Sequence, residues 1–376
     1  MTRFKNIFIA VFAYVCSFYL CRKQNATVTN GSTVAIIHTG KLGDMVCATP
    51  MIQALVSAQQ GFVCCVASNS INKEILAHNT SVGQFIVWPK SLFEKVKSLR
   101  RVKPNVVCIT TPNFDSLVAA IFSGAHKIIA PNVVGGYSPY MTIAYRILLS
   151  RVVHVPFFMN EYVPQQYINL LAPLGIISQD TTKKVFYSNE ALKFAQIIIK
   201  KDHNRAIGLA LGAGNDIKQW PIKKFVELTR ELLRRNITDI VYIFGGAKEK
   251  DIIQDFRNHF STQELERIIS VSDVSIDELK ACISRLDLFV GVDTGPIYIA
   301  EAFNIPLVDI IGPVSEKEQP PQGPNARLVY LRDRKKPEIH IMNSRVYNVA
   351  EARRQIEEIT VEMVLKAIDE LLPKSL

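Results

Sequence analysis

Short apolar runs alternate with longer helix-like segments through the first half of the chain, beginning after Ser32. The runs are rich in β-branched and aromatic residues, whereas segments such as 45–60 and 92–100 have the length and spacing of helices. Strands that are separated by helices pair in parallel, so the pattern predicts a parallel sheet covered by helices. The predicted strands are residues 34–37, 62–67, 85–88, 106–110 and 127–130, and a predicted helix over 164–174 closes this half.

The same alternation returns near Arg205 and predicts a second parallel sheet. Its predicted strands are 206–211, 240–244, 288–292 and 307–311, and its helices include 220–235, 276–285, 293–303 and 361–372. The chain is therefore predicted to be an α/β protein with two doubly wound, Rossmann-like domains that bind a ligand at the carboxyl ends of their strands. We expect an N-terminal domain over 33–185, a C-terminal domain over 186–350 and a C-terminal helix within 351–376.

The first 32 residues have a different pattern. Residues 7–21 are apolar except for Ser17, and the cations that flank them are Arg3, Lys5, Arg22 and Lys23. Fifteen helical residues span about 22 Å, less than the ~30 Å hydrocarbon core of a bilayer. No small-residue cleavage site follows, so the run is not typical of a signal peptide. We expect residues 1–32 to associate with a membrane, lying in it or partly entering it; the alternative is an unstructured extension.

Charge is unevenly distributed between the halves. Residues 1–185 contain 17 Lys and Arg against 6 Asp and Glu, whereas residues 186–376 contain 27 against 28. The first half should therefore favour an anionic surface or substrate. Nucleic acid is not the expected partner, because no basic helix with interleaved aromatic residues and no nucleic-acid motif occurs.

Glycine turns follow several strands of the second half. They lie at Gly212–Gly214, Gly245–Gly246 and Gly312, and Lys218 follows the first of them. In a parallel sheet these turns gather at one edge, where backbone amides attract phosphate. Lys218 could neutralise the charge that grows on a departing diphosphate. The alternative for any single turn is that its glycines only connect a strand to the following helix and bind nothing.

A second signal lies at the start of a predicted helix. Asp293 and Thr294 precede Gly295 and Pro296, where an Asp or Thr commonly caps the helix. Capping does not explain Gly295, which permits close approach of the backbone. We therefore expect this turn to contact the ligand.

In the first half, Gly43 and Asp44 follow the first strand. The turn is not a P-loop, because the required Gly-Lys spacing is absent. Asp44 could accept the proton of an attacking hydroxyl, or it could be an N-cap carboxylate stabilised by the helix dipole. The residues alone favour neither role.

Three motifs in this order give the chain a resemblance to glycosyltransferase family 9, the lipopolysaccharide heptosyltransferases. They are Lys41-Leu42-Gly43-Asp44-Met45 with Thr49-Pro50, Lys218-Gln219-Trp220-Pro221, and Asp293-Thr294-Gly295-Pro296. The resemblance covers about residues 33–372. It implies a GT-B fold, in which two Rossmann-like domains face a cleft. It also implies inverting transfer of a heptose from ADP-L-glycero-D-manno-heptose, without a metal or other cofactor, to the Kdo or heptose of the inner core.

The resemblance also implies roles for individual residues. Asp44 would be the general base, and Lys218 would bind the phosphates. The residues expected to bind the donor are Gly214, Lys218, Gly245, Gly246, Asp293, Thr294, Gly295 and Tyr298, and those expected to bind the acceptor are Lys41 and Gly43. Tyr298 stands where the family commonly has His; Tyr can donate a hydrogen bond but carries no positive charge. No Asp-x-Asp pair for a divalent ion occurs.

The expected partners are a nucleotide-sugar donor, an anionic glycolipid acceptor and a membrane surface, at the cytoplasmic, inner face of the inner membrane. Two alternatives keep the same fold: a transferase that uses a different nucleotide sugar, and a sugar-nucleotide-binding protein without turnover. A nucleotide-sugar epimerase is a third alternative, but it needs more acid and base groups than these motifs supply.

Overall fold

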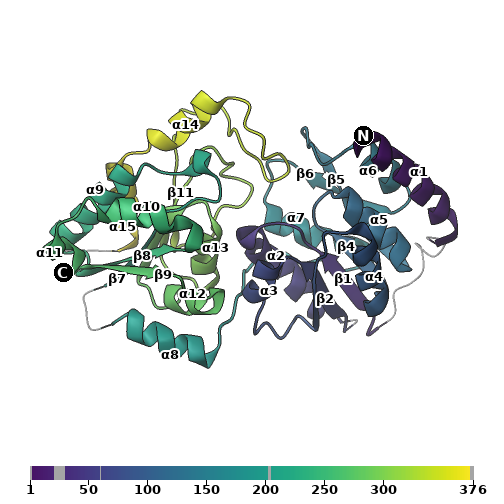
Figure 1. The fold of residues 1–376 in the computed structure, drawn as a ribbon, viewed down its shortest axis with the longest axis horizontal. Helices are drawn as coiled ribbons and strands as arrows, with labels where there is room; N and C mark the ends of the chain where they lie inside the picture. Colours follow the sequence, from purple (N-terminus) through teal and green to yellow (C-terminus); the bar gives the residue numbers. More distant parts are fainter. Residues whose placement is uncertain (1, 21–29, 60, 202–204, 373–376) are drawn as a thin grey trace. The chain divides into compact units, whose positions relative to one another are not determined.

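The chain forms two compact units, each built on one parallel sheet. The computed structural model describes residues 2–20, 30–59, 61–201 and 205–372. Unit 1 spans Met1–Thr182 with Ile341–Asn343, and unit 2 spans Lys183–His340 with Ser344–Leu376 (Figure 1). The predicted α/β class with two doubly wound sheets is confirmed.

The sheet of unit 1 has six parallel strands in the order β3-β2-β1-β4-β5-β6. The strands are β1 (Thr33–Ile37), β2 (Val63–Ser68), β3 (Gln84–Val87), β4 (Val106–Ile109), β5 (Lys127–Val134) and β6 (Val153–Phe158). The sequence pattern did not predict β6. This edge strand carries exposed His154 and Pro156 between partly buried residues, so it lacks a continuous apolar run.

The helices of unit 1 are α1 (Thr2–Leu20), α2 (Leu42–Val56), α3 (Ser70–Ile75), α4 (Leu92–Val102), α5 (Phe114–Ser123), α6 (Ile143–Leu149) and α7 (Val163–Asn169), followed by the short η1 (Ala172–Leu174). The helix predicted from Met45 begins earlier, at Leu42. Asp44 therefore lies inside the first turn of α2. The predicted helix over 164–174 is divided into α7 and η1.

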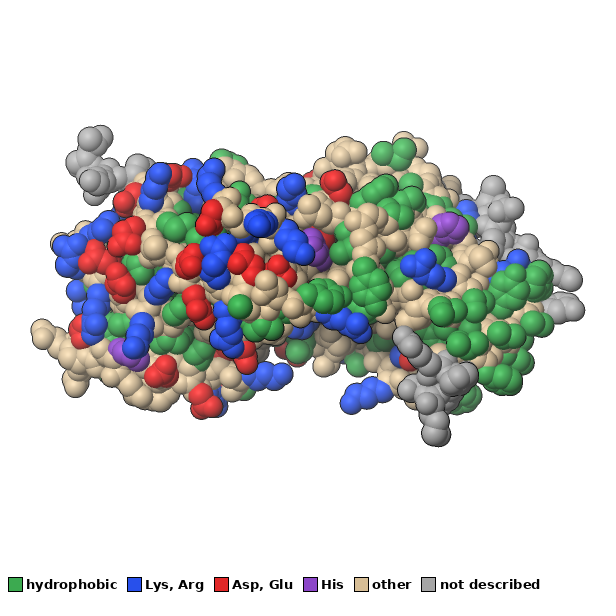
Figure 2. Space-filling model, turned by 90° about the horizontal axis from the view of Figure 1, so that it is seen from above, with side chains coloured by type: hydrophobic (Ala, Val, Ile, Leu, Met, Phe, Trp, Pro, Cys, Tyr) green, Lys and Arg blue, Asp and Glu red, His purple; other side chains and the backbone are tan. Residues whose placement is uncertain are grey.

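Helix α1 packs against α5 and α6 (Figure 1). The alternative of an unstructured extension is therefore wrong for residues 2–20. No helix among the described residues is long and apolar enough to cross a membrane. The flanking cations Arg3, Lys5, Arg22 and Lys23 lie outside the residues whose side chains the structure describes. Figure 2 shows hydrophobic side chains gathered on the part of unit 1 that carries α1, and mixed charges on unit 2.

The sheet of unit 2 has the parallel order β12-β11-β10-β7-β8-β9. Its strands are β7 (Ala206–Ala210), β8 (Ile240–Gly245), β9 (Ile268–Ser272), β10 (Leu288–Val292), β11 (Leu307–Ile310) and β12 (Ala326–Val329). The edge strands β9 and β12 were not predicted. Only Val329 of β12 is buried, and the sequence of this strand is too short and too polar to predict a buried strand.

The helices of unit 2 are α8 (Asn189–Ile198), η2 (Asp216–Lys218), α9 (Ile222–Arg234), η3 (Ala247–Glu249), α10 (Lys250–Arg257), α11 (Thr262–Leu265), α12 (Ile276–Ile283), α13 (Gly295–Ala302), α14 (Val349–Glu357) and α15 (Val361–Leu371). Residues from α9, α10 and α15 pack with one face of the sheet into a single apolar core. This core supports the strand ends described below.

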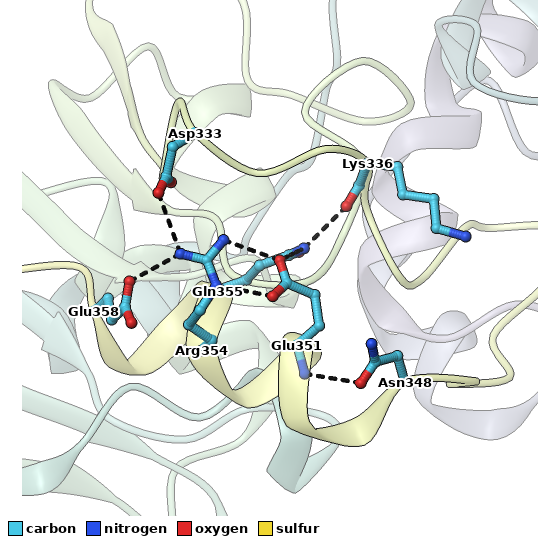
Figure 3. A network of polar contacts seen from close by, with 7 residues as sticks. All are labelled: Asp333, Lys336, Asn348, Glu351, Arg354, Gln355 and Glu358. Atoms are coloured by element: carbon cyan, nitrogen blue, oxygen red, sulfur yellow. Dashed lines mark hydrogen bonds and ion pairs between the residues drawn. The ribbon is translucent and has the colours of Figure 1, made fainter.

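A network of hydrogen bonds and ion pairs joins α14 to the segment between β12 and α14 (Figure 3). The Arg354 guanidinium donates to both carboxylate oxygens of Glu351 and also contacts Asp333 and Glu358. The side-chain amide of Gln355 donates to the backbone oxygen of Lys336 at 2.9 Å. These contacts hold α14 beside the segment that follows β12.

Candidate active site

The carboxyl ends of β7, β8, β10 and β11 lie at one edge of the unit 2 sheet, because all four strands are parallel. Gly245 is the last residue of β8, and the turns that begin at Gly212, Asp293 and Gly312 start within two residues of the ends of β7, β10 and β11. The prediction that these turns gather at one sheet edge is therefore confirmed. This edge is where an open α/β sheet binds its ligand.

The Lys218-Gln219-Trp220-Pro221 motif is held in place by its two middle residues. The Trp220 side chain is fully buried, and its indole Nε1 donates to the backbone oxygen of Ile359 at 3.0 Å. The Gln219 amide donates to the backbone oxygen of Leu211 at 2.7 Å, which ties the motif to the end of β7. Trp220 and Gln219 thus position Lys218 at the sheet edge.

Lys218 and Asp293 form an ion pair at this edge. The distance from Lys218 Nζ to Asp293 Oδ2 is 2.6 Å, and the two side chains are only 18% and 15% exposed. The Tyr298 hydroxyl, from α13, donates to the other carboxylate oxygen of Asp293. Three residues expected to bind the donor therefore contact one another, and the Lys218 charge is balanced by Asp293.

Thr294 is the N-cap residue of α13, but its side chain makes no capping hydrogen bond. Its hydroxyl oxygen is buried and has no hydrogen-bond partner among the described residues. Helix capping by the side chain therefore does not explain why Thr294 occupies this position. Gly295 is the first residue of α13, so the positive end of the helix dipole faces this turn.

A buried carboxylate, Asp309, lies in the neighbouring strand β11. It is fully buried, and neither carboxylate oxygen has a hydrogen-bond partner among the described residues. Burial raises the pKa of Asp309 well above its usual value, and the negative charge of Asp293 raises it further. The protonated form is therefore favoured. Sequence reasoning missed this residue, although an Asp inside the apolar run Leu307–Ile310 was a visible signal.

Three of the glycines lie against Glu249 or Ile253, and a Cβ atom on Gly246 would lie 3.2 Å from Glu249 Oε2. The Glu249 carboxylate accepts a hydrogen bond from the backbone N–H of Gly246 at 2.8 Å. A Cβ atom on Gly212 would lie 2.4 Å from Glu249 Cγ, and one on Gly245 would lie 2.7 Å from Ile253 Cδ1. A phosphate at this turn would meet the Glu249 carboxylate, so donor binding by Gly245 and Gly246 stays a prediction.

In unit 1, Asp44 lies in the first turn of α2. Its Oδ2 accepts a hydrogen bond from the backbone N–H of Lys41 at 2.8 Å, which satisfies a donor at the helix N-terminus. Gly43 is buried beside it, whereas Lys41 is exposed. The N-cap residue of α2 is Lys41 and not Asp44, although the Asp44 carboxylate does bind the N-terminus of the helix; its role as general base stays a prediction.

His38, the residue that follows β1, lies close to Asp44 and was missed from the sequence. Its Nδ1 is hydrogen-bonded to Thr110 Oγ1 at 2.9 Å, and the ring is 1% exposed. Burial lowers the pKa of His38 to about 4. The negative charge of Asp44 acts in the opposite direction and raises this pKa, but its effect is smaller than that of burial. A Cβ atom on Gly40 would lie 2.7 Å from His38 Nε2 and 2.9 Å from Asp44 Oδ2. Gly40 therefore lets a neutral imidazole approach the carboxylate.

Two other features of the structure bear on ligand binding. Among the described residues, no group of three or more His, Cys, Asp and Glu side chains could hold a metal ion. A pocket of about 600 Å³ lies between α10 and β9 of unit 2, and none of the predicted site residues lines it. Its charged residues include Lys250 and Asp273, which form an ion pair at 2.8 Å.

Comparison with known proteins gives a consistent result. The model of glycosyltransferase family 9 (heptosyltransferase) matches residues 95–346. Lipooligosaccharide heptosyltransferase 2 of Haemophilus influenzae is 24% identical over 362 residues, which cover 91% of this chain and 99% of that protein. The structure of Escherichia coli ADP-heptose lps heptosyltransferase II has a TM-score of 0.71 at 19% identity, covering 90% of this chain and 98% of that one. Escherichia coli heptosyltransferase WaaC with ADP-2-deoxy-2-fluoro heptose has a TM-score of 0.64 at 14% identity, covering 90% and 100%.

Two doubly wound parallel sheets are the architecture of the GT-B fold, which the chain shares with the heptosyltransferase structures, and the family match makes the chain a glycosyltransferase. The family match covers well over half of the sequence. The chain belongs to glycosyltransferase family 9, the heptosyltransferase family.

Proposed function

We propose that this enzyme transfers a heptose from ADP-heptose to the inner core of lipopolysaccharide, with inversion at the anomeric carbon. The observation that supports this most directly is the Lys218–Asp293 ion pair at the sheet edge, beside the start of α13. One structural relative is an ADP-heptose heptosyltransferase, and another was solved with ADP-2-deoxy-2-fluoro heptose. The proposed location is the cytoplasmic face of the inner membrane.

Donor binding exchanges one partner of Lys218 for another. The diphosphate replaces Asp293 as the counter-ion of Lys218, and the N-terminus of α13 adds the favourable end of its dipole. Asp293 keeps its hydrogen bond from Tyr298 and turns its other oxygen to the donor. Gly214, Thr294 and Gly295 supply the remaining contacts to the phosphates. Gly245 and Gly246 contact an uncharged part of the donor, because the Glu249 carboxylate occupies the amide of their turn.

The acceptor is bound by unit 1. Lys41 and Gly43 contact it, and Asp44 accepts the proton of the attacking hydroxyl. Unit 1 holds 15 Lys and Arg against 6 Asp and Glu, which suits a glycolipid rich in phosphate and carboxylate. Lys218 stabilises the leaving diphosphate in the place of a divalent cation.

A ligand-dependent melting experiment tests the choice of donor. Saturating nucleotide sugar stabilises a protein by RT ln(1 + [L]/Kd), which is about 2.7 kcal/mol at 100 times Kd. ADP-heptose should raise the melting temperature more than UDP-glucose, UDP-N-acetylglucosamine or ADP alone at equal concentration. An equal or larger shift with a UDP-sugar would contradict the proposed donor.

A second candidate is transfer of a different sugar by the same fold. It is favoured by Tyr298, which occupies the position where the family commonly has His and which cannot carry a positive charge at neutral pH. The same melting series separates the two candidates, because it compares the donors under identical conditions.

A further inference from the structure

Helix α1 is buried on its small-residue side. The buried side chains are Ala10, Ala13 and Ser17, which share one face at helical spacing and lie against α5 and α6. Arg151 Nε donates to Ser17 Oγ at 3.0 Å, which fixes this face to unit 1. The helix is therefore docked along the protein surface over its described length.

The outward side of α1 is apolar, which reverses the usual arrangement of a surface helix. The exposed side chains from position 7 to 18 are Ile7, Phe8, Val11, Phe12, Val15 and Phe18. Phe8 is 77% exposed and Phe12 is 59% exposed. Contiguous exposed apolar surface of this kind marks an interaction site. Figure 2 shows this concentration of hydrophobic side chains on unit 1.

Cations border this apolar face. The Arg151 guanidinium lies 3.9 Å from the centroid of the Phe18 ring. Exposed Arg100 donates from Nε to the backbone oxygen of Phe122 at 2.8 Å, and the Phe122 ring stacks on Phe12 with centroids 6.2 Å apart. Both guanidinium groups therefore lie beside residues of α1.

This combination identifies the partner chemically. An apolar ridge bordered by arginines matches a bilayer of anionic lipids, whose acyl region takes up the ridge while the headgroups pair with the cations. A second copy of this chain fits less well, because two basic units would be brought together. The opposite face of α1 is packed on unit 1, which fits binding along the bilayer surface.

We infer that α1 is an in-plane anchor, which inserts its outer face into the interface of an anionic bilayer while its inner face stays packed on α5 and α6. The inference explains how a soluble donor and a lipid-linked acceptor meet at one enzyme. The inference does not depend on the identity of the donor. Its test uses neither donor nor acceptor, so the test can be interpreted even if the proposed transfer reaction is wrong.

The test is co-sedimentation of the full chain with vesicles of phosphatidylcholine mixed with phosphatidylglycerol, compared with pure phosphatidylcholine. We expect tighter binding to the anionic vesicles, weakened by salt. The variant Phe8→Ser/Phe12→Ser should bind at least about tenfold more weakly, because two large apolar side chains no longer insert. The matched control is Ile197→Ser, which removes a side chain 72% exposed on α8 of unit 2.

The outcomes are distinguishable. Unchanged binding by Ile197→Ser and unchanged melting of all variants would show that the loss is local to α1. The inference is overturned if the wild-type chain does not bind anionic vesicles, or if Phe8→Ser/Phe12→Ser binds as tightly. It is also overturned if light scattering shows a dimer in solution that Phe8→Ser/Phe12→Ser dissociates while vesicle binding is absent.

Discussion

At the scale of single residues, Asp44 combines a structural contact with a proposed chemical role. One carboxylate oxygen accepts the backbone N–H of Lys41, as a helix-capping side chain does. An Asn side chain can make the same contact but cannot take a proton. We therefore expect Asp44→Asn to reduce transfer by about 10²–10⁴-fold, with donor affinity and melting temperature almost unchanged.

The matched control for Asp44→Asn is Glu94→Gln, which neutralises a carboxylate in the first turn of α4 in the same unit. Steady-state kinetics should show normal turnover for Glu94→Gln. Near-normal turnover by Asp44→Asn would end its assignment as the base and leave it a helix cap.

Lys218 is expected to act in both donor binding and transfer. Lys218→Met keeps most of the side-chain length and removes the charge that faces the diphosphate. Turnover should fall by about 10²–10³-fold, with weaker donor binding in calorimetry. Lys223→Met, at an exposed lysine of α9, is the control. Equal kinetics for the two variants would show that the ion pair with Asp293 is structural.

Asp309 gives a prediction for stability against pH. Its pKa is raised in the folded state, chiefly by burial, so the folded protein binds the proton more tightly than the unfolded chain, whose Asp pKa is near 3.9. This contribution to stability is present below the unfolded pKa and is lost as pH rises through the folded pKa.

Asp309→Asn removes the titrating group and keeps its shape. Above pH 4 the variant should be increasingly more stable than the wild type, and at pH 8 its melting temperature should be higher by at least about 2–4 °C, the shift that 1 kcal/mol produces in a protein unit of this size. Calorimetry at several pH values measures the difference. A gain that is the same at pH 4 and pH 8 would contradict the raised pKa.

The sequence identified candidate site residues but not the contacts between them. Lys218 and Asp293 were singled out from their motifs, but they are 75 residues apart and their pairing depends on the order of β7 and β10 in the sheet. Glu249 and His38 were missed because neither belongs to a motif. Their importance comes from what the glycines beside them allow, which only the folded chain reveals.

At the scale of elements, the strands that the sequence predicted are those with a continuous apolar run. The central strands β1, β4, β7 and β10 are buried along nearly their whole length, so they read as continuous apolar runs. The edge strands β6, β9 and β12 have mixed burial, and their pairing is set by the neighbouring strand rather than by their own composition. The fourth edge strand, β3, was predicted although none of its residues is buried, because residues 85–87 form an apolar run.

Helix α14 gives a prediction at this scale. A Cβ atom on Gly312 would lie 2.7 Å from Cβ of Ile356, which is buried in the core of unit 2. Gly312→Ala should therefore displace α14 and cost about 1–3 kcal/mol of the free energy of unfolding, measured in urea.

A double-mutant cycle identifies the cause. Ile356→Ala alone should destabilise by about 2–5 kcal/mol. Gly312→Ala/Ile356→Ala should cost less than the sum of the two single changes, because Ala lacks the Cδ1 and Cγ1 atoms that would lie 2.9 and 3.1 Å from the new Cβ, and α14 can shift into the space they leave. Additive costs would show that Gly312 and Ile356 do not interact as the structure indicates.

At the scale of the whole molecule, the two units carry different charges and different proposed tasks. Unit 1 contains nearly all of the net charge of +10, together with α1 and Asp44. Unit 2 contains the Lys218–Asp293 pair and is close to neutral overall. This division fits an anionic glycolipid at unit 1 and a nucleotide sugar at unit 2. The sequence predicted the division of charge because it depends on composition alone.

The most direct test is mass spectrometry of a transfer reaction. The purified chain is incubated with ADP-heptose and a deacylated inner-core acceptor that ends in Kdo or heptose, with Asp44→Asn as the background control. The account predicts an acceptor heavier by one heptose, one ADP released for each transfer, and an anomeric configuration opposite to that of the donor. An acceptor whose mass is unchanged with ADP-heptose but increases with another nucleotide sugar would contradict it.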